Sequence, residues 1–108
     1  MKKIDYIVPE TGVKLTIPSF EVKTMEDIYD KWERDIYNSI VKCLTRMSET
    51  ELDSLACFAI TVQGVESIFN LDRNRAQEQV ENCIEYYESI EEYETCALIK
   101  NLKLQFNT

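Results

Sequence analysis

Histidine is absent from the 108-residue chain, and glycine and proline occur only twice each. Without histidine, a nucleophilic cysteine or serine lacks its commonest general base, and a metal site lacks a frequent nitrogen ligand. The sequence also contains neither a glycine-rich phosphate loop nor an H-E-x-x-H motif. We therefore expect a protein that is not an enzyme, with no catalytic residues, no metal site and no cofactor.

Long hydrophobic runs are missing as well. The longest nearly apolar run, Leu55 to Val62, is far too short to cross a bilayer, and no apolar signal-peptide segment occurs near the N-terminus. The four cysteines are Cys43, Cys57, Cys83 and Cys96, and no two of them form a C-x-x-C motif. Cysteines spaced this widely are typically buried structural thiols, and one disulfide is the alternative. These features predict a cytoplasmic protein with reduced cysteines and no membrane partner.

Basic residues are outnumbered by acidic ones. The chain has 12 Lys and Arg against 20 Asp and Glu, which gives a formal net charge of −8. Residues 48–70 carry four acids and no base, and residues 71–92 carry seven acids against two arginines. Such a surface repels phosphate backbones and attracts basic partners, so direct nucleic-acid binding is not expected.

The N-terminal segment has the pattern of a β-hairpin. Apolar and polar residues alternate over 4–8 and over 13–17, and Pro9-Glu10-Thr11-Gly12 between them has turn chemistry. Residues 20–22 alternate again after Pro18, which is compatible with a third short edge strand. We expect a single domain, residues 1–108, with a hairpin in 1–23 and helices in 24–108.

Three to four helices are predicted after the hairpin. An apolar stripe from Met25 to Met47, preceded by a capping-box pattern at Thr24 and Asp27, predicts a first helix with Trp32 on its core face. Tyr37 and Val41 lie at the edge of this stripe and are candidates for exposed contacts. A second capping box at 48–51 predicts a heavily apolar helix that ends at Gly64 or continues to 70. The predicted fold class is α+β, mostly α, with an N-terminal β-hairpin packed on a bundle of three to four helices.

The C-terminal third predicts a third helix from about 75 to 90. The following residues, Glu92-Tyr93-Glu94-Thr95-Cys96-Ala97-Leu98-Ile99-Lys100-Asn101, resemble the second half of a UVR-type helical hairpin, a protein-interaction module. In that family the aromatic residue and the small pair lie at the bend between two antiparallel helices. The resemblance implies a break near Ile90, and one continuous helix over 73–105 is the alternative.

The third helix combines an apolar face with an acidic ridge. Glutamates spaced by three and four residues repel one another by ~0.2–0.5 kcal/mol per pair, and the only nearby bases in the sequence are Arg73 and Arg75. These arginines can also act as local counter-ions of Asp72 and Glu78. Tyr86 is expected to be partly exposed beside the ridge, as in many protein-binding surfaces. The predicted partner-binding residues are Glu78, Glu81, Glu85, Tyr86, Glu88 and Glu92.

These features predict a small acidic protein-interaction module, an adapter or inhibitor of the kind that phages and mobile elements encode. It would bind a basic protein surface, and the ridge could imitate a nucleic-acid backbone on a nucleic-acid-binding protein. The alternative is a structural or nucleic-acid-associated homo-oligomer such as a homodimer, or an assembly chaperone, in which the charge serves solubility alone. Salt dependence separates the two, because apolar dimerisation is insensitive to ionic strength.

Overall fold

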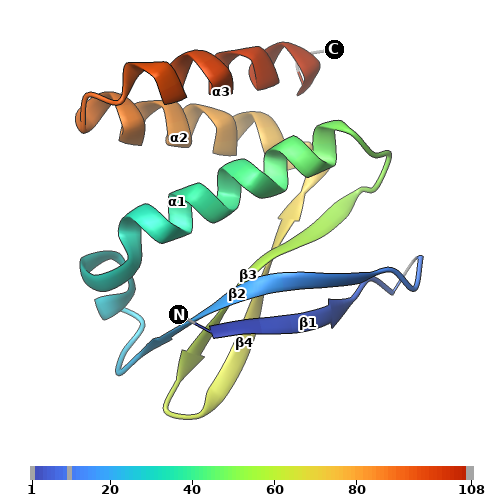
Figure 1. The fold of residues 1–108 in the computed structure, drawn as a ribbon, viewed down its shortest axis with the longest axis vertical. Coiled ribbons are helices and arrows are strands. Elements are labelled where there is room, and N and C mark those ends of the chain that lie inside the picture. Colours follow the sequence, from blue (N-terminus) through green and yellow to red (C-terminus); the bar gives the residue numbers. More distant parts are fainter. Residues whose placement is uncertain (1, 10, 107–108) are drawn as a thin grey trace.

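A computed structural model describes residues 2–9 and 11–106, so Glu10 of the predicted turn lies outside the described residues. The chain forms a four-stranded sheet with three helices stacked over one of its faces (Figure 1). The elements are β1 (Lys2–Ile7), β2 (Lys14–Val22), α1 (Asp27–Ser48), β3 (Ser54–Val62), β4 (Val65–Asp72), a 3-10 turn (Arg73–Arg75), α2 (Ala76–Ser89) and α3 (Tyr93–Phe106).

The predicted hairpin and first helix are confirmed. β1 pairs with β2 in antiparallel register, with Ile4 opposite Ile17. The predicted third short strand is the end of β2, which continues through Pro18 because pairing with β3 begins only at Ser19. The capping box at Thr24 is wrong, since the first turn of α1 has no side-chain cap and Asp27 instead donates its backbone N–H to the carbonyl of Thr24.

The predicted fold class is wrong in its central segment. Residues 54–70 were expected as a helix with an extension, but residues 54–72 form β3 and β4. The N-terminal strands join them in one mixed sheet of order β1-β2-β3-β4. The hairpin is therefore half of a sheet and does not pack as a unit on a helical bundle. β2 and β3 run parallel, and α1 makes the crossover between them.

The turn at residues 63–64 explains this error. Gln63 and Gly64 both have positive φ, 49° and 81°, which is the conformation of a two-residue type I′ hairpin turn. Gly64 therefore joins two strands, where the sequence interpretation had it end a helix. A short apolar run such as Leu55 to Val62 fits either a buried helix or a buried strand, and its β-branched and aromatic residues favour the strand.

The core lies between the sheet and the helices. α1 packs against the sheet on one side and against α2 and α3 on the other (Figure 1). Phe20, Leu44, Val80, Tyr87 and Ile99 are almost completely buried there. Trp32, predicted as a core residue, is only half-buried: its ring packs against Phe20 with centroids 5.3 Å apart, and its indole N–H donates to the carbonyl of Glu21.

The break after Ile90 is confirmed, because α2 and α3 form an antiparallel helical hairpin. Glu91 adopts φ 60° at the bend, and the N–H of Glu92 donates to the carbonyl of Tyr87 at 2.9 Å. All four cysteines carry free, buried thiols. Among the residues that the structure describes, no helix is both long enough and apolar enough to span a membrane.

Candidate functional site

The six predicted partner-binding residues do not share one free surface. Four of the glutamates each form an ion pair with a base from α1, α3 or the 3-10 turn before α2. The pairs are Glu78 with Arg75 at 3.3 Å, Glu81 with Lys103 at 3.4 Å, Glu88 with Lys100 at 3.8 Å, and Glu92 with Arg34. The premise that only Arg73 and Arg75 are near the ridge is therefore wrong.

Tertiary packing supplies these counter-ions. The α2–α3 hairpin brings Lys100 and Lys103 alongside the ridge, and α1 brings Arg34 to its far end. Arg75 pairs with Glu78 as expected, but Arg73 turns away from Asp72 to the C-terminal end of α1. The repulsion within the ridge is offset inside the protein, so it no longer argues for a basic partner along the whole ridge.

Tyr86 lies on the side of α2 that faces α1, whereas Glu85 lies in a surface depression between α2 and α3 together with Lys100 and Lys103. Glu85 has no ion pair within residues 2–9 and 11–106. Tyr86 is half-buried, in agreement with the prediction of partial exposure, because its ring stacks on Tyr37 of α1 with centroids 4.1 Å apart and planes 8° apart. The contact between α1 and α2 thus contains two stacked phenol rings.

An apolar groove of about 350 Å³ lies beside this stack, between α1, α2 and the sheet. Ile36, Ile40 and Phe58 form much of its inner surface, and Phe58 stacks on Phe69 of β4 at 4.9 Å. Three of its outer side chains are large and exposed, with exposed fractions of 55% for Met25, 57% for Tyr29 and 36% for Phe69. The remaining lining residues are Ile28, Tyr37, Ile60, Gln79 and Asn82.

The edge of the groove is acidic. Burial raises the pKa of Tyr37, and the nearby Tyr29, Cys83, Glu33 and Glu85 raise it further. Burial also raises the pKa of Tyr86, with Glu33 adding to the effect. Carboxylates thus raise the pKa of both phenols, while the guanidinium of Arg34 lowers that of Tyr86. The arrangement offers apolar surface, amide groups and negative charge to a ligand. The structure brings no set of three potential metal ligands together among the described residues.

Sequence reasoning missed Tyr29, Glu33 and Phe69 as members of this site. A signal for two of them is present, because Tyr29, Glu33 and Tyr37 are spaced by four residues and lie along one row of α1. Tyr37 had been expected at the edge of the apolar stripe, and the structure confirms that position. Phe69 could not be found, because residues 65–70 were interpreted as helix.

The chain matches no protein-family model, no curated protein and no solved structure.

Proposed function

We propose that this protein is a non-enzymatic interaction module that binds a basic, amphipathic segment of a partner protein in the groove between α1 and α2. The single observation that carries the proposal is the groove itself, where exposed apolar side chains adjoin free carboxylates. Large apolar surface at the exposed edge of a helical protein is characteristic of interaction sites.

The chemistry of the groove defines the partner. Its apolar lining accepts aliphatic or aromatic side chains spaced along one face of a helix, which is the recurring mode of helix-in-groove recognition. Glu33 on α1 and, to a smaller extent, Glu85 on α2 raise the pKa of Tyr37, so positive charges at the flanks of the bound segment are favoured. The net charge of −8 strengthens the long-range attraction of such a segment.

Tyr86 contributes an aromatic ring that is held in place by its stack on Tyr37. Its stack on Tyr37 holds both rings at the wall between the groove and the acidic edge, where each phenol can contact a ligand without further ordering. Aromatic residues of this kind are frequent anchors in protein interfaces. We place the protein in a reducing cytoplasm, since its four buried thiols are free. An adapter or inhibitor role fits this binding mode.

A direct test uses a model peptide. An amphipathic 18-residue peptide of leucine and lysine, with leucines at helical spacing, would be titrated into ¹⁵N-labelled protein. We expect saturable shifts at Tyr29, Tyr37, Gln79 and Asn82, and affinity that falls between 50 and 300 mM salt. A scrambled peptide of the same composition should bind at least tenfold more weakly, because its leucines no longer share one face.

Matched pairs of variants test whether carboxylates near the groove strengthen peptide binding. Glu33→Gln with Glu85→Gln should weaken peptide binding several-fold, chiefly through the association rate. Glu51→Gln with Glu66→Gln removes the same charge from exposed positions away from the groove and serves as the control. The proposal is wrong if both pairs weaken binding equally, or if the shifts map outside the groove. A salt-insensitive dimer in sedimentation experiments, with the groove residues at its interface, would instead support the homo-oligomer.

A further inference from the structure

The bases of this acidic protein are unevenly distributed. Five of them pair with carboxylates, and Arg73 binds backbone carbonyls. The other six all belong to the first half of the chain, and no carboxylate of the described residues lies within ion-pair distance of any of them; they are Lys2, Lys3, Lys23, Lys31, Lys42 and Arg46. Three of these six meet at one cavity.

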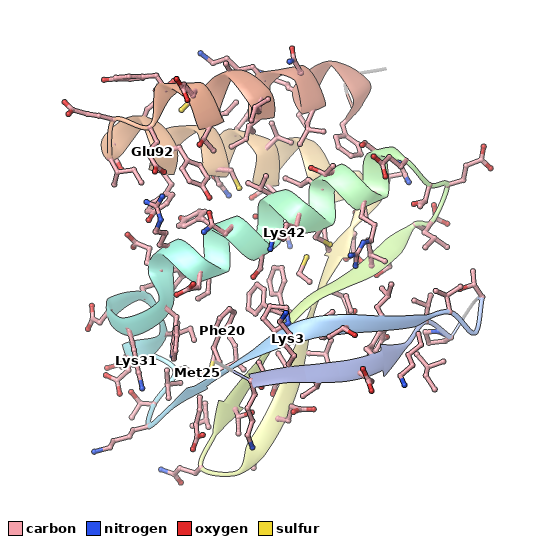
Figure 2. All side chains as sticks on the ribbon, viewed as in Figure 1. Lys3, Phe20, Met25, Lys31, Lys42 and Glu92 are labelled. Atoms are coloured by element: carbon pink, nitrogen blue, oxygen red, sulfur yellow. The ribbon has the colours of Figure 1, made fainter. Side chains whose placement is uncertain are left out.

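That cavity has a volume of about 290 Å³ and lies between α1 and the β1–β2 hairpin, away from the α1–α2 groove. Lys3 lines it from β1 and Lys42 from α1 (Figure 2). Arg46 of α1 also belongs to the lining. Lys42 and Arg46 are four residues apart on the helix, where like charges repel. Asp35 is the only acid among the described residues of the lining, and with the three bases these side chains carry a net charge of +2.

Neutral donors and a buried floor complete the cavity. The hydroxyl of Tyr87 donates to Oδ1 of Asn38, which leaves the Asn38 NH₂ group free to donate to a ligand. The floor consists of almost fully buried small residues, whose apolar and sulfur atoms suit a short organic group; it contains Ser39, Cys43, Ala56 and Cys57.

We propose that this cavity binds a small phosphate-bearing anion. A guanidinium fork and two ammonium groups are the side chains that bind phosphate oxygens in proteins, and a net +2 lining matches a phosphate dianion. Polynucleotides are not the ligand, because the rest of the protein repels a long phosphate backbone. The site is separate from the groove, so this proposal stands or falls independently of the proposed function.

The test is a titration of ¹⁵N-labelled protein at constant ionic strength, with sodium chloride as the balancing salt. The probes are inorganic phosphate, glycerol 3-phosphate, succinate and glycerol. We expect saturable shifts for Lys3, Asn38, Lys42 and Arg46 with both phosphates and none with glycerol. Tighter binding of glycerol 3-phosphate would identify a phosphate ester as the ligand, and equal or tighter binding of inorganic phosphate would identify the free ion.

Variants of the lining residues show whether phosphate binds in the cavity. Lys42→Gln and Arg46→Gln should each weaken phosphate binding by about tenfold, since each removes a charge-assisted hydrogen bond. Lys31→Gln, an exposed change of the same charge on α1 outside the cavity, should alter the affinity by less than about twofold. Equal weakening by all three variants, non-saturating shifts, or tighter binding of succinate than of either phosphate would overturn the proposal.

Discussion

The guanidinium of Arg73 donates a hydrogen bond at 3.0 Å to the carbonyl of Met47, which lies 26 residues earlier in the last turn of α1. The same side chain donates to the carbonyls of Thr50 at 2.7 Å and Leu52 at 2.9 Å. A cation at a helix C-terminus satisfies free carbonyls and complements the helix dipole. Arg73 thus joins the end of β4 to the end of α1, and so stabilises α1 as the crossover between the parallel strands β2 and β3.

Replacing Arg73 by Ala should lower the free energy of unfolding by about 2–3 kcal/mol, because three partly buried carbonyls lose a charged donor. Urea unfolding would measure the change. Arg75→Ala is the control: Arg75 is exposed and pairs only with Glu78, so its loss should cost at most about 0.5 kcal/mol. Similar losses in the two variants would show that the contacts of Arg73 do not matter for stability.

The Tyr37–Tyr86 stack should couple α1 to α2. A double-mutant cycle with Tyr37→Leu and Tyr86→Leu should give an interaction energy of about 0.5–1.5 kcal/mol in thermal or urea unfolding. Tyr29→Leu, an exposed tyrosine on the same helix, provides the comparison with Tyr86→Leu and should show no coupling. Additive effects in the first cycle would mean that the stack makes no specific contribution.

Stability should fall in alkaline solution. Burial raises the pKa of the Cys83 thiol to about 12, above its ordinary value of 9.0. The unfolded chain therefore releases this proton first, so the stabilisation is complete below pH 9 and is lost as the pH rises from 9 towards 12. Cys83→Ala should flatten the decline between pH 8 and 11, although it lowers stability at neutral pH. An unchanged slope in this variant would contradict the assignment.

Neutralising different glutamates of α2 should change the free energy of unfolding in different directions. Glu85→Gln removes charge without breaking an ion pair and should leave stability unchanged or raise it by tenths of a kcal/mol. Glu88→Gln also removes the partner of Lys100 and should lower stability by up to about 0.5 kcal/mol. Both would be measured by urea unfolding at low salt. If Glu88→Gln were the more stabilising change, repulsion within the ridge would exceed its ion pairs.

The thiol state can be counted directly. Alkylation under denaturing, non-reducing conditions should add four labels, one on each free cysteine, as measured by intact mass. Under native conditions labelling should be far slower, because all four side chains are buried. Only two labels in the denatured protein would demonstrate a disulfide and remove the argument for a reducing compartment.

Local patterns were sufficient for much of the fold. Alternation over residues 4–8 and 13–17 predicted β1 and part of β2, and the apolar stripe from Met25 to Met47 predicted α1 within two residues of its observed start. The break near Ile90 was also predicted, from a local resemblance. Each of these elements has a single hydrophobic period in the sequence, and that period matches the secondary structure it forms.

Residues 54–72 show where local pattern fails. A nearly continuous apolar run has no clear period, so burial on both sides looks the same for a helix and for a strand. The capping-box pattern at 48–51 added a false helix signal, whereas Ser48 is the last residue of α1. The decisive feature is the Gln63-Gly64 turn, and a positive φ at Gln63 is not apparent from its residue type.

The amino-acid sequence by itself determined the acidic balance, the buried cysteines, the hairpin and the amphipathic helices, because these depend on composition and on neighbours a few residues apart. Only the tertiary structure decided which glutamates are free. Lys100, Lys103 and Arg34 pair with glutamates of the ridge from other elements, whereas Tyr86 stacks on Tyr37 at the edge of a groove formed by distant segments. Ion pairs and grooves depend on distances in space, and chain spacing specifies those distances only within a single element.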